Sequence, residues 1–222
     1  PPFLAQVTQN GFFTGFTAML LALPLFLPLT VAVVSGDTIA GEAGLGTIRY
    51  LLIAPVNRAR LLIVKYLASL VFILAGTFTL MIAGALIGAA LFPVGPVTLL
   101  SGDTISIFEA FGRMALVALY TTVSLSGMAA VGLFISTLTT VPVGAMTATL
   151  VTSGVSNILG NIPQLEWMHA WLFTYYWLDF ADLMRVPIEW GSLASNLVLQ
   201  LGWIAVFGAL AYGRFTTKDI LS

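Results

Sequence analysis

The sequence predicts an all-α fold, a polytopic bundle of helices that cross a membrane. Hydrophobic residues make up 59% of the 222 residues and charged residues only 8%, whereas an ordinary soluble domain carries about a quarter charged residues. Several uncharged runs also reach the roughly 20 residues that a helix needs to cross the hydrocarbon core. We therefore expect a single transmembrane domain over residues 1–222.

Five spans are expected from these runs. The uncharged run from Met114 to Leu165 is too long for one helix, and the polar segment Ser136–Pro142 supplies a turn that divides it into two. In the first span, Pro24 and Pro28 each remove a backbone donor and are expected to kink the helix. The spans are placed at about 11–35, 61–92, 114–135, 142–162 and 191–213.

The basic residues predict the orientation, because Lys and Arg are retained on the cytoplasmic side of short loops. Most of them lie near the loop 36–60 or in the C-terminal tail, so both are placed inside. Alternation then places the segment 163–190 outside. Five spans leave the N-terminus outside, and an uncharged outer start without Met leads us to expect one more helix before Pro1, giving six in the full protein.

The cytoplasmic loop contains a short amphipathic pattern. Leu45, Ile48 and Leu52 share one helical face, so a short helix that ends before Pro55 is expected along the membrane surface. One interpretation is an interfacial anchor, in which Arg58 and its basic neighbours only set topology and contact lipid headgroups. The other is a handle for a soluble motor protein, because short connections transmit a push stiffly.

The same loop and the start of the next span contain a characteristic order of residues. It consists of an acidic residue (Glu42), a Gly-Thr pair (Gly46-Thr47), a Leu-Leu step (Leu51-Leu52), a proline (Pro55) and two basic residues (Arg58 and Lys65). This order resembles the first cytoplasmic loop of the permease subunits of type-2 ABC exporters. The resemblance extends to the long uncharged pair of spans, the outer segment and the basic end of the final helix. It implies that the loop forms a coupling helix docked on a separate ATPase subunit.

The resemblance also implies partners and residue roles. The coupling residues are expected to be Glu42, Gly46, Thr47, Arg49, Leu52, Pro55, Arg58 and Arg60. Glu42 and the arginines are expected to form charge-assisted bonds across the interface with the ATPase. The chain itself would bind no cofactor, since ATP and Mg would be held by the ATPase subunits. A second permease, identical or related, would complete the transporter in the cell membrane, a bacterial inner or plasma membrane.

Small residues in the spans predict close helix packing. Gly84 and Gly88 form a GxxxG pair, and Ser126 with Ala130 forms a similar small pair. The segment 163–190 is rich in Trp and Tyr, whose rings favour the headgroup level. We expect it to form an outer interfacial or re-entrant segment.

Four other residues have two open interpretations each. Phe12, Phe13 and Phe16 on the first span either line a hydrophobic substrate pathway or contact lipid. Asn157 either contacts the substrate or forms hydrogen bonds with neighbouring helices.

Composition argues against several other functions. The chain has no cysteine and a single histidine, so a metal site built on Cys or His is not expected. Its formal net charge of -1 gives no basic excess for nucleic acid. The sequence also has no GxxxxGK[ST] phosphate loop, which argues against an ATPase site of that type in this chain. The spans carry no charge deep inside, which argues against an ion-coupled carrier, because such a carrier usually needs intramembrane carboxylates.

These observations predict a transport subunit rather than an enzyme, the permease of an ATP-driven ABC exporter for a hydrophobic or amphipathic substrate. The alternatives are a secondary carrier, an intramembrane enzyme, or a membrane assembly protein without an ATPase partner. A carrier should show internal carboxylates or paired broken helices, and an enzyme should show a convergent polar triad. Neither pattern is present in the sequence.

Overall fold

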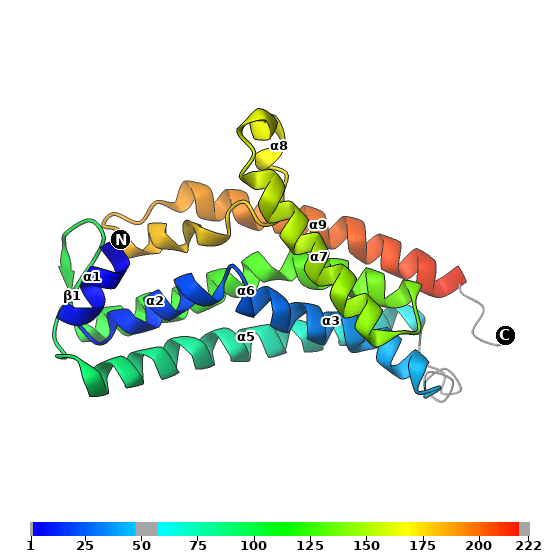
Figure 1. Cartoon of the computed structure of the whole chain (residues 1–222), viewed down its shortest axis with the longest axis horizontal. Helices are drawn as coiled ribbons and strands as arrows, with labels where there is room; N and C mark the ends of the chain where they lie inside the picture. Colours follow the sequence, from blue (N-terminus) through cyan, green and yellow to red (C-terminus); the bar gives the residue numbers. More distant parts are fainter. Residues whose placement is uncertain (1, 48–56, 218–222) are drawn as a thin grey trace. The chain divides into compact units, whose positions relative to one another are not determined.

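The structure is a computed structural model that describes residues 2–47 and 57–217, and nearly all of its regular elements are helices (Figure 1). The longer elements are α1 (Pro2–Gln9), α2 (Phe13–Ala22), α3 (Phe26–Gly44), α5 (Arg58–Leu91), α6 (Ile107–Leu138), α7 (Pro142–Gly160) and α9 (Trp190–Thr217). The short helices between α7 and α9 are η1 (Pro163–Leu165), α8 (Glu166–His169) and η2 (Trp177–Met184). The predicted all-α class is thereby confirmed.

A small hairpin between α5 and α6 is the one element of another kind in the described residues. Strands β1 (Val97–Thr98) and β2 (Thr104–Ile105) pair antiparallel. The sequence analysis did not predict them, because two residues a strand are too few to show an alternating pattern. Gly102 in the turn between them has a φ of +89°, a conformation that a residue with a Cβ rarely adopts.

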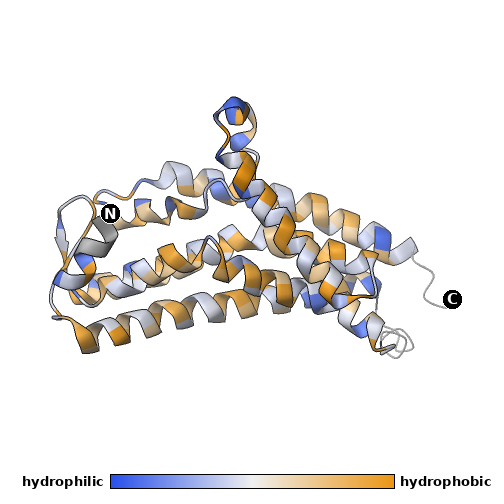
Figure 2. Cartoon of the chain, viewed as in Figure 1, coloured by the Kyte–Doolittle hydropathy of each residue, from blue (hydrophilic) through white to orange (hydrophobic). Residues whose placement is uncertain are grey.

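Four described helices, α5, α6, α7 and α9, are long and apolar enough to cross a membrane. The pair α2 and α3 passes the same test together and is bent at the break between them, so it gives a fifth span if it is counted as one. Figure 2 shows hydrophobic residues along these helices and hydrophilic residues near their ends and in the connecting segments. The number of candidate spans agrees with the five predicted.

The break between α2 and α3 has a local cause. Residues 23–25 form a turn around Pro24, which has no N–H for the helical hydrogen bond to the preceding turn. Pro28 does not interrupt α3, because it lies in the first turn, where a helical N–H has no acceptor to lose.

Helix α3 continues past residue 35, where the predicted first span ends. Residues 36–44, which the sequence analysis assigned to the loop, are helical. In the sequence the polar residues of this segment resemble a loop. In the structure Ile39 and Ala40 are buried, whereas Asp37 is exposed. This alternation matches one buried face of a helix. Helix α6 likewise runs to Leu138, so the predicted turn before α7 is limited to residues 139–141.

The contacts divide the chain into two compact units, and α5, α6 and α9 contribute residues to both. Unit 1 consists of Pro1–Leu27, Ile73–Ser124 and Tyr176–Leu197. Unit 2 consists of Pro28–Phe72, Leu125–Tyr175 and Val198–Ser222.

In unit 1, α2 packs closely against α5 through glycines. A Cβ placed on Gly88 would overlap the carbonyl oxygen of Gly11, and one placed on Gly84 would lie 2.9 Å from the Cα of Gly15. Because any side chain there would push the helices apart, the Gly84 and Gly88 pair occupies a close helix contact of the kind expected for GxxxG.

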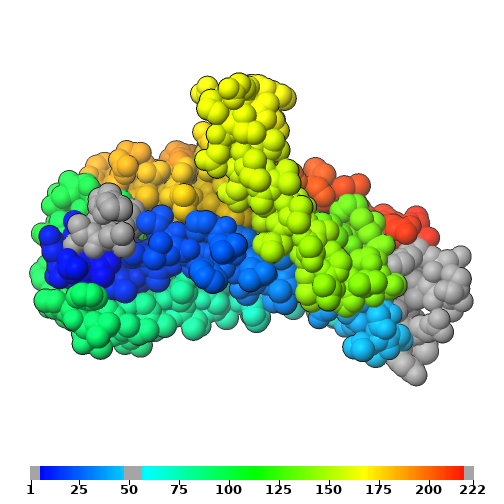
Figure 3. Space-filling model, in the orientation of Figure 1, coloured from blue at the N-terminus to red at the C-terminus, as the bar shows by residue number. Residues whose placement is uncertain are grey.

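In unit 2, α3, α5, α6 and α9 share a small apolar core. It contains the buried residues Ile39, Leu62, Leu133, Ala211 and Phe215. Ser126 and Ala130 on α6 are also buried, and the Ser126 carbonyl accepts a hydrogen bond from the Tyr66 hydroxyl at 3.0 Å. Helix α7 lies beside α3 (Figure 3), where a Cβ on Gly36 would come within 2.8 Å of the Met146 nitrogen.

Candidate functional site

The loop that carries the sequence motif leaves α3 and enters α5, and both of its flanks belong to unit 2. Five of the predicted coupling residues are described: Glu42, Gly46, Thr47, Arg58 and Arg60. Three lie outside the described residues: Arg49, Leu52 and Pro55. The same holds for most of the predicted amphipathic helix, so the candidate site is built from the two flanks.

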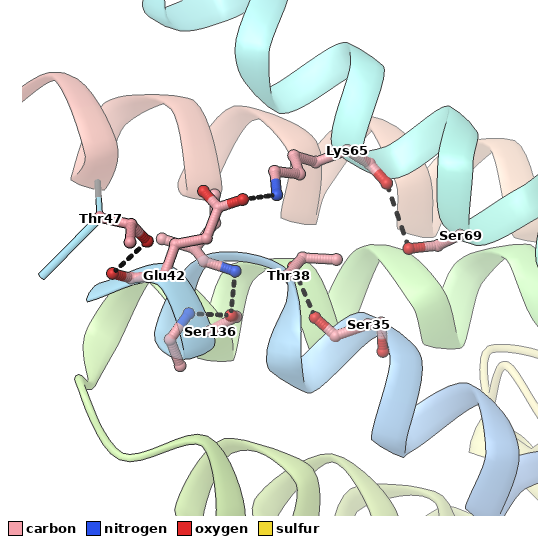
Figure 4. Close-up of polar contacts among 9 residues, drawn as sticks. Ser35, Thr38, Glu42, Thr47, Lys65, Ser69 and Ser136 are labelled. Carbon is pink, nitrogen blue, oxygen red and sulfur yellow. Dashed lines mark hydrogen bonds and ion pairs between the residues drawn. The ribbon is translucent and has the colours of Figure 1, made fainter. Parts of the chain in front are cut away.

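An ion pair joins these flanks. The ammonium group of Lys65 in α5 donates a hydrogen bond to Oε1 of Glu42 near the end of α3 (Figure 4). The two side chains are only 23% and 26% exposed, so water screens their attraction less than it would on an open surface. Because one partner precedes the loop and the other follows it, the pair ties α3 to α5.

A cleft of about 380 Å³ lies beside the ion pair. Its charged lining residues are Asp37, Glu42 and Lys65, and its other lining residues include Thr38 and Pro142. Two carboxylates against one ammonium group make this lining acidic on balance. A basic side chain of a partner protein is the kind of group that such a cleft attracts.

Helix α3 ends in a glycine cap. Gly46 has a φ of +71°, its N–H donates to the Ala43 carbonyl at 3.2 Å, and the N–H of Thr47 donates to the Glu42 carbonyl at 3.0 Å. These two bonds form the Schellman motif, in which glycine is preferred because the left-handed conformation costs it least. Leu45 therefore belongs to the end of α3, whereas the sequence analysis expected it to begin a helix.

Helix α3 is also held by α6. The Ser136 hydroxyl oxygen accepts hydrogen bonds from the backbone N–H groups of Ile39 and Ala40, at 2.9 and 2.8 Å (Figure 4). Ser136 is completely buried, so water does not compete for these bonds. The sequence analysis placed Ser136 in a turn and gave it no role.

The start of α5 is held by the end of α9. The Arg58 guanidinium donates from Nη1 to the carbonyls of Phe215 and Thr216, at 2.9 and 3.1 Å. A cation at the C-terminus of a helix satisfies carbonyls that have no helical donor and opposes the negative end of the helix dipole. The side chain of Asn57 caps α5 itself by accepting from the Ala59 N–H at 2.9 Å.

Together these contacts connect four helices beside the loop. We call the set of contacts made by the side chains of Glu42, Lys65, Ser136 and Arg58 the helix clamp. The clamp links α3 to α5, α3 to α6, and α5 to α9.

Glu42 and Arg58 both have partners within the chain. Their bonds with an ATPase subunit stay a prediction. Arg60 is exposed and remains accessible to a partner. Lys65 was part of the motif, but nothing in the sequence indicated that its partner is Glu42.

The residues proposed for a substrate pathway lie in different surroundings. Phe13 and Phe16 are completely buried in unit 1, so within this chain they face neither lipid nor a pathway. Phe12 is partly exposed and makes an edge contact with Phe111. In unit 2, Asn157 donates to the Ser153 carbonyl of its own helix at 3.0 Å, and its two interpretations, contact with the substrate or hydrogen bonds with neighbouring helices, stay open.

Unit 1 contains a second polar region, which anchors the segment around η2. The Tyr120 hydroxyl donates to the Tyr176 carbonyl at 2.6 Å, and the buried Arg113 guanidinium donates to the carbonyls of Leu183 and Arg185. We call Arg113 and Tyr120 the backbone anchor, because their acceptors are main-chain carbonyls.

Asp179 lies in the same anchored segment. Its partial burial, and secondarily the negative charge of Asp182, raise the pKa of the Asp179 carboxyl to about 6. Asp182 itself accepts a hydrogen bond from Ser192 at 2.5 Å and pairs with Arg185 at 3.5 Å. The raised pKa brings the change of charge of Asp179 closer to neutral pH than that of an ordinary aspartate.

Within residues 2–47 and 57–217, no group of three His, Cys, Asp or Glu side chains is arranged to hold a metal ion. Residues 5–220 match the model of a family described as ABC-2 family transporter protein. No curated protein matches the chain.

Proposed function

Because this chain belongs to the ABC-2 family of transporter membrane proteins, we propose that it is the permease subunit of an ATP-driven exporter. The family consists of membrane permeases that lack the ATPase domain, and they generally pair with ABC ATPase subunits. ATP and Mg would accordingly be bound by the partner. A second permease, identical or related, would complete the pathway.

The loop between α3 and α5 is the proposed entry point for movement of the ATPase. The observation that carries this role is the Glu42–Lys65 ion pair, which closes the loop at its base. A push on a loop with free flanks would bend the loop, whereas a push on a loop with joined flanks moves α3 and α5 together. Ser136 and Arg58 extend the same movement to α6 and α9.

A cytoplasmic position of this loop is supported by its charges. Arg58, Arg60 and Lys65 lie at the start of α5, and Arg214 lies in the last turn of α9. Arg58 bonds the end of α9, so these basic residues gather at one end of the helices. Basic residues at one end favour that end as the cytoplasmic one.

The proposed substrate is hydrophobic or amphipathic. The candidate spans have few charged residues, and the surfaces they expose are largely apolar. A charged substrate would need compensating charges along its path, because an unpaired charge in the hydrocarbon region is costly.

Two other functions remain as alternatives to be tested, a secondary carrier and a membrane assembly protein. Neither would need an ATPase subunit. Association with an ATPase is therefore the property that separates the proposal from both alternatives.

The test is co-expression of the chain with a candidate ABC ATPase, followed by affinity purification through the chain and measurement of ATP hydrolysis. The proposal predicts that the ATPase co-purifies. It also predicts that Glu42→Gln lowers the ATPase rate of the complex at least fivefold, because the base of the loop is no longer closed.

Glu109→Gln is the matched control. Glu109 also pairs with a basic residue, Arg113, but it is half exposed and lies in unit 1, so its substitution should leave the ATPase rate unchanged. Failure of every candidate ATPase to co-purify would contradict the proposal and favour the carrier or the assembly protein.

A further inference from the structure

Unit 2 contains an apolar groove at the start of α5 and near the end of α9 that the coupling role does not use. Its cavity volume is about 370 Å³, within the range of sites that hold small ligands. The groove runs between α5 and α9 with α6 as its floor, and the floor residues Ala130 and Leu133 are buried.

The lining of the groove is apolar and its mouth is open to the surroundings. Ile63 is 57% exposed and Tyr212 is 48% exposed at the mouth. The polar atom of Tyr66, another lining residue, is already occupied, since its hydroxyl donates to the Ser126 carbonyl. A groove of this kind in a membrane helix bundle faces acyl chains.

The polar end of the groove is basic. Arg58 holds the start of α5 level with the end of α9. Two exposed arginines adjoin lining residues in the sequence, Arg60 directly after Ala59 and Arg214 two residues after Tyr212. Residues 58–66 and 204–217, which include the lining residues of α5 and α9, contain no Asp or Glu.

We propose that this groove is a binding site for one anionic phospholipid. An acyl chain lies along the apolar groove, and the phosphate of the headgroup contacts Arg60 and Arg214. Charge complementarity selects the occupant, because guanidinium groups bind phosphate oxygens with charge-assisted hydrogen bonds. The proposal requires only that the chain lies in a membrane, so it does not depend on an ATPase partner.

Glycine positions on α9 allow a clean test. Gly208 lines the groove, and a Cβ built on it meets no atom within 4 Å, so Gly208→Phe fills the groove without a backbone clash. Gly202 lies on the same helix with equally open surroundings and does not line the groove. Gly202→Phe is therefore the matched control.

The experiment is titration of the detergent-solubilised protein with phosphatidylglycerol, with bound lipid counted by native mass spectrometry. Phosphatidylcholine, a zwitterion without net charge, is the comparison. We expect one tightly bound phosphatidylglycerol per chain. Gly208→Phe should weaken its binding at least tenfold, and Gly202→Phe should not change it. Arg60→Gln should weaken phosphatidylglycerol binding about fivefold and leave phosphatidylcholine binding unchanged.

Equal binding to wild type and Gly208→Phe would overturn the proposal. An equal loss in Gly208→Phe and Gly202→Phe would also overturn it, because it would indicate only the general lipid shell. If Gly208→Phe instead separates associated copies of the chain, measured by light scattering, the groove is a protein interface and the lipid proposal is wrong. If Gly208→Phe does not fold, the proposal is tested by Arg60→Gln alone. Unchanged binding of phosphatidylglycerol to Arg60→Gln would then overturn the proposal.

Discussion

The two polar regions of the molecule hold their helices in different ways. In the backbone anchor of unit 1, Arg113 and Tyr120 donate to main-chain carbonyls. In the helix clamp of unit 2, the bond that closes the loop joins two side-chain charges, Glu42 and Lys65. A carbonyl acceptor is fixed by the fold, whereas an ion pair can break and re-form by rotamer changes. The anchor is thus suited to holding a segment in place and the clamp to transmitting movement.

The largest loss of stability is expected from removing the buried cation of the backbone anchor. Arg113→Met deprives the carbonyls of Leu183 and Arg185 of their donor, and an unsatisfied buried polar group is costly. We expect the free energy of unfolding to fall by about 3 kcal/mol, measured by thermal denaturation in detergent. Arg185→Met is the control, since the Arg185 side chain is 50% exposed, and it should cost less than about 1 kcal/mol.

A smaller loss of stability but a larger loss of function is expected at the clamp. Lys65→Met removes one partner of a partly buried ion pair and leaves Glu42 without it. Unfolding should become easier by about 2 kcal/mol, while the ATPase rate of the complex falls at least fivefold. If Arg113→Met reduces the ATPase rate of folded complexes as strongly as Lys65→Met does, the distinction between holding and transmitting is wrong.

The hydroxyl of Ser136 should contribute less. Ser136→Ala removes the acceptor for the backbone N–H groups of Ile39 and Ala40, and we expect a loss of about 1 kcal/mol in the same denaturation measurement. Ser195→Ala is the comparison, because the exposed Ser195 hydroxyl bonds only the Gly191 carbonyl of its own helix. A loss as large at Ser195 would indicate that the contact with α3 does not matter.

A pH dependence of stability is expected in the anchored segment. Burial raises the pKa of Asp179 from 3.8 to about 6, so the folded state binds a proton more tightly than the unfolded state. The contribution of Asp179 to the free energy of unfolding is therefore largest below about pH 4 and decreases as the pH rises through 6. Asp179→Asn should flatten the dependence between pH 4 and 6 in thermal denaturation. A wild-type stability that rises over that window, with no change in Asp179→Asn, would contradict this.

Sequence patterns predicted the parts of the fold that depend on composition along a segment. The presence of apolar candidate spans, the break at Pro24 and the Gly84 and Gly88 contact follow from apolar runs, a missing N–H and missing side chains. The end of α3 was placed too early, because the polar residues Asp37 and Glu42 resemble a loop when the buried Ile39 is not yet known to face α6.

The candidate site was predicted only in part. The motif identified the loop, but the pairing of Glu42 with Lys65 connects residues on two helices, and charge alone does not select a partner. Within the chain, Arg58 donates to backbone carbonyls at the end of α9, which the sequence did not indicate. Every helix ends with carbonyls that have no helical donor. The sequence therefore does not show which of these carbonyls accept hydrogen bonds from a distant arginine.

The central claim is that contact between the charges of Glu42 and Lys65, rather than either residue alone, couples the loop to the spans. The most direct test is to exchange the charges and measure ATP hydrolysis by the purified complex. Glu42→Lys and Lys65→Glu should each lower the rate at least fivefold, and the double variant should recover at least half of the wild-type rate. A double variant as slow as the single ones would contradict the claim.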